Sequence, residues 1–289
     1  MKPDRQATMK TKHRATTAFD LRRIERESFV RQVEFHPLLA STNDRALQLA
    51  AEPDVPTPLL VLAEQQSAGR GRGANRWWSG PGALTFSLVL AADALGLSPP
   101  RWPRVALAAG VAVCEVLQPL VPHLPCGIRW PNDVHLSGRK VCGILSESRP
   151  AGMAFGLPSR LVLGIGINVN NSLAGAPPEV RGIGISLCEM AGAPYDLTDF
   201  LLRLLGGLAG KLDALGRDDR RLAESWSQLC LLRGRAVELD LGTERVCERC
   251  QGTDAEGALL LETPHGTRRF FGGVIRSVGA ALQTRGCDR

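Results

Sequence analysis

A change of pattern near Leu232 is the feature that most restricts how this chain can fold. Upstream of it, short apolar runs predict buried strands, and runs with helical spacing predict amphipathic helices. The strands are expected at residues 59–63, 84–90 and 160–168, and the helices at 103–117, 197–215 and 222–231. Downstream, only short strands separated by turn residues are predicted, at 236–241, 246–251, 258–262 and 268–271. We therefore expect an α/β (α+β) unit over residues 31–231 and a small β-barrel over residues 232–289.

The positive charge is concentrated at the N-terminus. Of the formal net charge of +6, residues 1–31 supply +5, because they hold nine Lys or Arg and four Asp or Glu. The rest of the chain is close to neutral, which argues against a strongly basic surface for DNA or RNA. Residues 1–30 are predicted to form a basic, disordered tail, with a weak anion tether or a targeting segment as alternatives.

The apolar runs and the cysteines bear on the compartment. No run is long enough to span a bilayer, and no secretory signal is recognisable near the N-terminus, so we expect a cytoplasmic protein with reduced thiols. Of eight cysteines, Cys114, Cys142 and Cys188 lie among apolar residues and are predicted to be core residues. Cys247 and Cys250 form a single CxxC pair, and because nothing completes a zinc site, no metal site is predicted.

A Gly/Arg-rich segment, residues 64–73, follows the strand predicted at 59–63 and leads to Trp77. Its alternating glycines let the backbone approach a ligand, and Arg70 and Arg72 supply the fixed charge that phosphate binding needs. The spacing is neither that of a Walker loop nor that of a dinucleotide fingerprint. From the residues alone, a flexible surface loop, an RNA contact and a mobile phosphate-binding loop all remain open.

A second cluster surrounds a predicted hairpin. Residues 129–133 read Arg-Trp-Pro-Asn-Asp, the turn is Ser137-Gly138, and Lys140 and Gly143 lie on the returning strand. Asp133 and Lys140 are expected to be close in space. A surface ion pair of about 0–1 kcal/mol would explain them equally well.

Two further motifs are unusual for residues with a purely structural role. Gly164 and Gly166 alternate within an apolar strand that leads to Asn168, and such glycines are tolerated where a backbone or a flat ligand packs closely. A strand crossing close to a helix is the alternative. Ser41 is predicted to cap a helix that runs to about residue 52, but capping does not account for Thr42 and Asn43.

Taken in order, these motifs resemble the biotin protein ligase family over roughly residues 30–280. The motifs are Ser-Thr-Asn at 41–43, Gln-x-Ala-Gly-Arg-Gly-Arg at 66–72, Trp-Pro-Asn-Asp at 130–133, Lys-x-x-Gly-Ile-Leu at 140–145 and Gly-Ile-Gly-Ile-Asn at 164–168. The resemblance implies a mixed sheet like that of class II synthetases, with flanking helices and a C-terminal SH3-like barrel. Many relatives also carry an N-terminal DNA-binding winged helix. We expect none here, and hence no repressor function, because too few residues precede Ser41.

The resemblance also implies a two-step reaction. Biotin and ATP, with Mg²⁺, give biotinyl-5′-AMP, and a lysine of a biotin carboxyl carrier domain of acetyl-CoA carboxylase or a related carboxylase then takes the biotin. The implied biotin-site residues are Ser41, Thr42, Asn43, Gln66, Gly69, Arg72, Lys140, Gly143 and Leu145. The implied ATP-site residues are Arg70, Trp77, Asn132 and Asn168, and the implied catalytic residues are Lys140, Arg70, Arg72 and Asp133. Residues 172–184 are expected to form a second loop over the adenylate.

The chain departs from the family pattern at Ala74 and Asn75, where a glycine and an arginine are common, so adenylate release is expected to be faster. The nearest alternative is a lipoate or octanoate ligase or transferase of the same superfamily, although such ligases usually lack the Gly-Arg-Gly-Arg segment. A nucleic-acid-binding protein is the alternative of another class, but the Gly/Arg segment has no interleaved aromatic residues. Monomer and homodimer remain open, and no membrane partner is expected.

Overall fold

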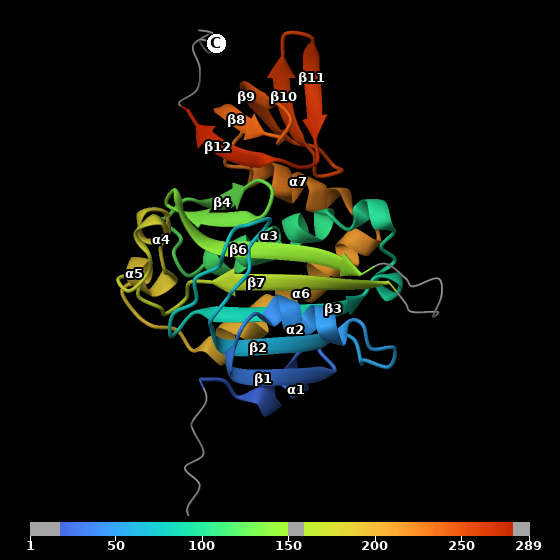
Figure 1. Cartoon of the computed structure of the whole chain (residues 1–289), viewed down its shortest axis with the longest axis vertical. Helices are drawn as coiled ribbons and strands as arrows, with labels where there is room; N and C mark the ends of the chain where they lie inside the picture. Colours follow the sequence, from blue (N-terminus) through green and yellow to red (C-terminus); the bar gives the residue numbers. More distant parts are fainter. Residues whose placement is uncertain (1–17, 150–158, 280–289) are drawn as a thin grey trace, which may run out of the picture.

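Two β-sheets divide the computed structural model, which describes residues 18–149 and 159–279 (Figure 1). The main sheet has seven strands in the order β1-β2-β3-β7-β6-β5-β4. Its strands are β1 (Gln32–Leu39), β2 (Leu59–Gln66), β3 (Leu84–Ala91), β4 (Cys126–Arg129), β5 (Asp133–Leu136), β6 (Arg139–Arg149) and β7 (Arg160–Ile167). Only β1 and β2 are parallel, and all other neighbours are antiparallel. The predicted mixed α/β class is confirmed.

The C-terminal sheet stands where the small barrel was expected. Its five antiparallel strands have the order β11-β10-β9-β8-β12. They are β8 (Ala236–Asp240), β9 (Arg245–Thr253), β10 (Leu259–Thr263), β11 (Gly266–Phe270) and β12 (Val274–Val278). Neither β12 nor β1 was foreseen as a strand. In both, polar residues interrupt the apolar ones and no residue is fully buried, whereas β2, β3 and β7 are buried over most of their length.

Helices cover the two faces of the main sheet unequally. The described helices are α1 (Leu21–Glu27), α2 (Thr42–Leu49), α3 (Arg104–Leu117), α4 (Pro178–Ile183), α5 (Leu187–Ala191), α6 (Leu197–Gly216) and α7 (Arg220–Gln228), with 3-10 turns at Asp93–Leu95 and Pro99–Arg101. In Figure 1, α2 lies in front of the sheet, and α3 and α6 lie behind it. Alternate residues of β2 therefore face different cores. Leu60 and Leu62 face the large core under α3 and α6, whereas Leu59 and Val61 face the small core under α2. No described helix has the length and apolar character needed to cross a bilayer.

The expected tail begins to fold earlier than its charge suggested. Residues 18–30 belong to the folded unit, because Asp20 caps α1 and Ile24 is fully buried. The apolar residues Phe19 and Ile24 outweigh the surrounding charge, since both pack into the large core. Residues 1–17 lie outside the described residues.

Tryptophan hydrogen bonds join the C-terminal sheet to the rest of the molecule. Trp226 of α7 donates from Nε1 to the Asp254 carbonyl at 2.9 Å, and Trp130 donates to the Gly257 carbonyl at 3.0 Å. Both indoles are only 2% exposed. Each acceptor lies in the turn between β9 and β10, so this turn is fixed against the main unit at two points.

We expect Trp226→Phe to lower the free energy of unfolding by about 1–3 kcal/mol, because the Asp254 carbonyl keeps only the Gly257 amide as its donor and the smaller ring fills less of the core. Urea denaturation followed by circular dichroism measures the change. A stability equal to that of the wild type would show that the hydrogen bond does not hold the C-terminal sheet in place.

Candidate active site

The register of three strands builds the floor of a pocket on the α2 side of the main sheet. Gly164 of β7 pairs with Ser87 of β3 and with Leu145 of β6. Two residues further along β7, Gly166 pairs with Thr85 and with Gly143. The pocket is lined by Ser41, Thr42, Asn43, Gln66, Arg70, Trp77, Leu145, Gly164, Ile165 and Gly166. Segments far apart in the sequence therefore meet on one face.

Both glycines of β7 are required by what lies on them. A Cβ at Gly164 would stand 1.9 Å from Asn43 Oδ1, and one at Gly166 would stand 2.4 Å from the ring of Trp77. The indole of Trp77 is thus packed onto the strand, with its Nε1 buried and without a hydrogen-bond partner among the described residues. The glycines were expected to admit a backbone, a flat ligand or a crossing helix, and the groups packed on them in this structure are two side chains, one of them from α2.

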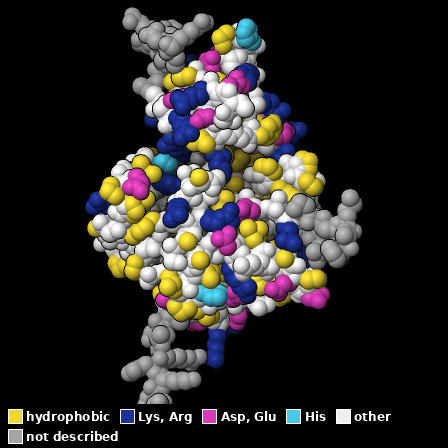
Figure 2. All heavy atoms as spheres, viewed as in Figure 1, with side chains coloured by type: hydrophobic (Ala, Val, Ile, Leu, Met, Phe, Trp, Pro, Cys, Tyr) yellow, Lys and Arg dark blue, Asp and Glu magenta, His cyan; other side chains and the backbone are white. Residues whose placement is uncertain are grey.

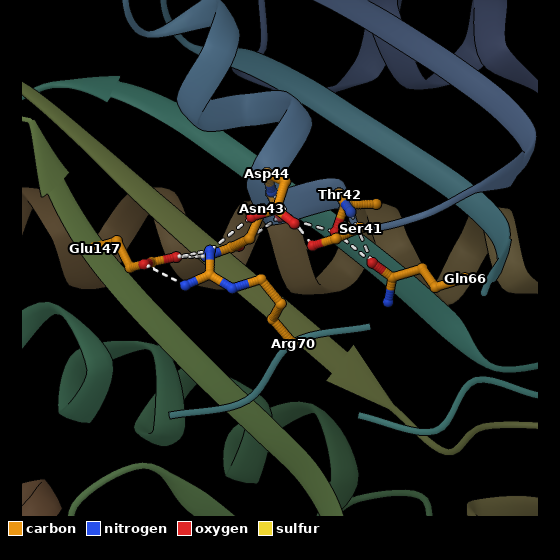
Figure 3. A network of polar contacts seen from close by, with 8 residues as sticks. Ser41, Thr42, Asn43, Asp44, Gln66, Arg70 and Glu147 are labelled. Carbon is orange, nitrogen blue, oxygen red and sulfur yellow. Dashed lines mark hydrogen bonds and ion pairs between the residues drawn. The ribbon is translucent and has the colours of Figure 1, made fainter. Parts of the chain in front are cut away.

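Polar groups meet at the N-terminus of α2 (Figure 3). Ser41 caps the helix by accepting from the Asp44 amide, as predicted. Thr42 donates to Gln66 Oε1 from its amide at 2.7 Å, and its hydroxyl lies 3.2 Å from the same oxygen. Ser87 Oγ lies 2.7 Å from Asn43 Oδ1. Thr42 and Asn43, which capping left unexplained, therefore present donors and acceptors at one end of the pocket.

The Gly/Arg segment forms a small hairpin that returns Trp77 to the pocket. Gly69 and Trp77 are joined by a backbone hydrogen bond, as are Gly71 and Asn75. A Cβ at Gly69 would lie 2.5 Å from the Trp77 carbonyl, so glycine is needed at this crossing. Arg70 points back onto the sheet, where its guanidinium pairs with Glu147 at 2.8 Å and Asp44 at 2.7 Å.

Lys140 reaches the pocket side through a register shift. Val134 pairs with Cys142 but His135 pairs with Lys140, so the pairing of β5 with β6 skips Val141. Lys140 therefore comes to the same side as Gly143, although the two are three positions apart. Its Nζ lies 2.7 Å from Asp133 Oδ1 and 5.9 Å from the centre of the Trp77 ring. The expected proximity of Asp133 and Lys140 is confirmed, and a cation beside Trp77 is more than a surface ion pair.

Two of the predicted residues lie in a separate cavity of about 350 Å³ at the junction of the two sheets, where Figure 2 shows a hollow with hydrophobic side chains. Arg72 lines it and donates to the Gly273 carbonyl at 2.5 Å, and burial lowers the pKa of its guanidinium. Asn132 also lines it and donates to the Ile144 carbonyl at 2.6 Å. Leu145 borders both this cavity and the pocket. Arg72 therefore shares this cavity with Leu145, whereas Ser41, Thr42, Asn43 and Gln66 line the pocket on β7.

Asn168 and the expected second loop lie beyond the far end of β7. The Asn168 side chain is 4% exposed and accepts a hydrogen bond from Asn171. The segment at residues 172–184 contains α4 and returns to β6, where the Ile185 amide donates to the Lys140 carbonyl at 3.0 Å. This return brings Gly184 beside Lys140.

Sequence reasoning missed Ser87 and Glu147. Each contacts predicted site residues, and each is a polar residue inside a strand, which is the one signal that would have indicated them.

The cysteines do not gather into a metal-binding cluster in the described region. Cys247 is exposed and Cys250 is buried, so the CxxC thiols lie in different surroundings. In residues 18–149 and 159–279, no group of three or more His, Cys, Asp or Glu side chains could hold a metal ion. Cys114 and Cys142 are buried as predicted, whereas Cys188 is half-buried.

Comparisons with known proteins agree with the motifs and the fold. Residues 35–168 match the model of the Biotin/lipoate A/B protein ligase family. The chain is 32% identical to the biotin–acetyl-CoA-carboxylase ligase of Paracoccus denitrificans, over 81% of this chain and 98% of that protein. It is 31% identical to the biotin–acetyl-CoA-carboxylase ligase of Mycobacterium tuberculosis, over 80% of this chain and 84% of that protein.

A solved structure shows the same arrangement. The biotin protein ligase of Aquifex aeolicus, in complex with biotin and ATP, superposes with a TM-score of 0.71 and 26% identity, covering 85% of this chain and 97% of that chain. With relatives above 30% identity that are covered almost end to end, the chain belongs to the biotin protein ligase family.

Proposed function

We propose that this protein is an ATP-dependent biotin protein ligase, which forms biotinyl-5′-AMP and transfers biotin to a lysine of a biotin carboxyl carrier protein. The observation that carries the proposal is the arrangement of one pocket. Thr42, Asn43 and Gln66 gather donors and acceptors at one end, a glycine floor lies in the middle, and Lys140 lies beside Trp77 next to that floor.

This arrangement suits biotin chemically. A ureido head carries one carbonyl and two N–H groups, which the polar end at Thr42 and Gln66 complements. Because Gly164 has no side chain, Asn43 can lie on β7, where it bonds to Ser87 and fixes the polar end of the pocket for a flat bicyclic ring. The acid's chain would then run toward Lys140, whose charge favours a carboxylate.

In the first step, a carboxylate oxygen of biotin bonds to the α-phosphorus of ATP, and pyrophosphate leaves with the electrons of the broken P–O bond. Negative charge develops on phosphate, so fixed positive charge is what this chain contributes. Lys140 and Arg70 are the cations nearest the pocket, and we assign them to this charge. ATP enters as its Mg²⁺ complex, in which the triphosphate carries the metal ion. Asn168, Asn132 and Arg72 are assigned to the nucleotide side.

In the second step, the carrier lysine nitrogen bonds to the acyl carbon, the acyl–phosphate C–O bond breaks and AMP leaves. The amine must lose a proton, and we assign that proton to the carboxylate of Asp133. Lys140 Nζ lies 2.7 Å from this carboxylate and fixes its position beside the reacting centre. We also place the protein in the cytoplasm, because the buried thiols of Cys114 and Cys142 suit a reducing compartment.

The activity test is ATP–pyrophosphate exchange by the purified protein with Mg²⁺, with biotin, lipoate and octanoate as separate substrates. We expect exchange with biotin alone, because the polar end of the pocket matches a ureido group and a dithiolane or methyl end has nothing to pair with it. Exchange with lipoate or octanoate but not with biotin would support the adenylation reaction and refute biotin as the substrate.

Asp133→Asn separates the two steps. We expect transfer to the carrier protein to fall by about 10²-fold or more, because the general base is lost. Adenylation is expected to fall much less, because Lys140 keeps its charge. Single-turnover transfer from preformed adenylate, beside the exchange assay, measures the two rates. Unchanged transfer by the variant would remove the proposed role of Asp133.

A further inference from the structure

Glu147 joins three parts of the site, although no sequence motif singles it out. It lies on β6 two residues after Leu145, on the same face of the sheet. Its Oε2 accepts from Asn43 Nδ2 at 2.7 Å and from Arg70 Nη1 at 3.0 Å, and its Oε1 accepts from Arg70 Nη2 at 2.8 Å. Figure 3 shows the guanidinium of Arg70 turned toward this carboxylate.

The pair with Arg70 has the geometry of a strong contact. Two parallel charge-assisted hydrogen bonds fix the orientation of the guanidinium as well as its distance. The pKa of Arg70 is raised, mainly by its hydrogen bonds to Glu147, so the charge on this side chain is secure. The Glu147 side chain is only 25% exposed, which limits its screening by solvent.

The ion pair of Glu147 with Arg70 attaches the Gly/Arg hairpin to β6. Arg70 belongs to the Gly/Arg hairpin whose returning strand places Trp77 on the pocket floor. Glycines make this hairpin flexible, so its closed position depends on side-chain contacts. Arg70 lines the pocket, whereas Glu147 lines the junction cavity, and the contact between them therefore stands where the two spaces adjoin.

We propose that Glu147 is a positioning residue that holds the Gly/Arg hairpin closed over the pocket through Arg70, and thereby sets how long the activated acid is retained before transfer. The inference rests on the proposed function, because it concerns retention of the adenylate that the function forms. Glu147 acts through Arg70 and through Asn43, and touches neither reacting atom.

Glu147→Gln tests the proposal with little change in shape. An amide keeps an oxygen for Asn43 but presents no charge, and only one acceptor, to Arg70. We expect labelled biotinyl-adenylate, formed on the variant and chased with unlabelled biotin and ATP, to leave about tenfold faster than from the wild type. The KM for biotin should rise, with a smaller change in kcat for pyrophosphate exchange.

Glu34→Gln is the matched control. Glu34 makes a similar two-bonded pair with Arg45, at 2.6 and 2.9 Å, with its side chain 21% exposed, but the pair lies outside the pocket. We expect adenylate release from this variant at the wild-type rate. Thermal melting of both variants shows whether either substitution acts through general stability.

Arg70→Lys provides the test of mechanism. Lysine keeps a charge but cannot make the two parallel bonds, so adding Glu147→Gln to Arg70→Lys should change release little further. Full additivity of the two effects would overturn the proposal, as would release from Glu147→Gln at the wild-type rate. Slower adenylate release from Glu147→Gln than from the wild type would also overturn the proposal, because Glu147 would then be keeping Arg70 from contacting the ligand.

The wild-type protein separates this inference from the proposed function. If the wild type forms no labelled adenylate from biotin, the proposed function fails and the role of Glu147 falls with it. If the wild type forms adenylate and Glu147→Gln holds it equally long, only the role of Glu147 is refuted.

Discussion

Close packing onto β7 at Gly164 and Gly166 is the constraint on which the rest of the site depends. Asn43 and Trp77 approach the strand more closely than any Cβ would permit. The first contact sets where the N-terminus of α2 stands, and the second sets where the Gly/Arg hairpin returns. A side chain at either position would move a wall of the pocket, and no change elsewhere could compensate without moving a strand or a helix.

Antiparallel pairing converts this local constraint into a site. Since neighbouring strands are in fixed register, Ser87 and Leu145 lie on either side of Gly164, and Gly143 lies beside Gly166. The shift between β5 and β6 then turns Lys140 to the same side and places it against Asp133. Residues from β3, β5, β6 and β7 are thus brought together at one site.

The sequence predicted those parts of the structure that depend on local chemistry. Ser41 as a cap and the turn at Ser137 and Gly138, both with positive φ, follow from the preferences of a few neighbouring residues. The order of the motifs predicted the family. Partners far apart in the sequence were beyond such reasoning: β12 forms by pairing with β8, and Arg72 of the Gly/Arg hairpin bonds to Gly273. The role of Glu147 likewise depends on the long-range pairing that brings it to Arg70.

Calorimetric titration of biotin into the wild type and into Gly164→Ala tests the central claim most directly. The account predicts one biotin site on the wild type and no measurable binding by Gly164→Ala, because a Cβ there would lie 1.9 Å from Asn43 Oδ1 and displace the polar end of the pocket. Circular dichroism would show that the variant remains folded. Equal biotin affinity of the two proteins would contradict the account, because the pocket on β7 would then not be where biotin binds.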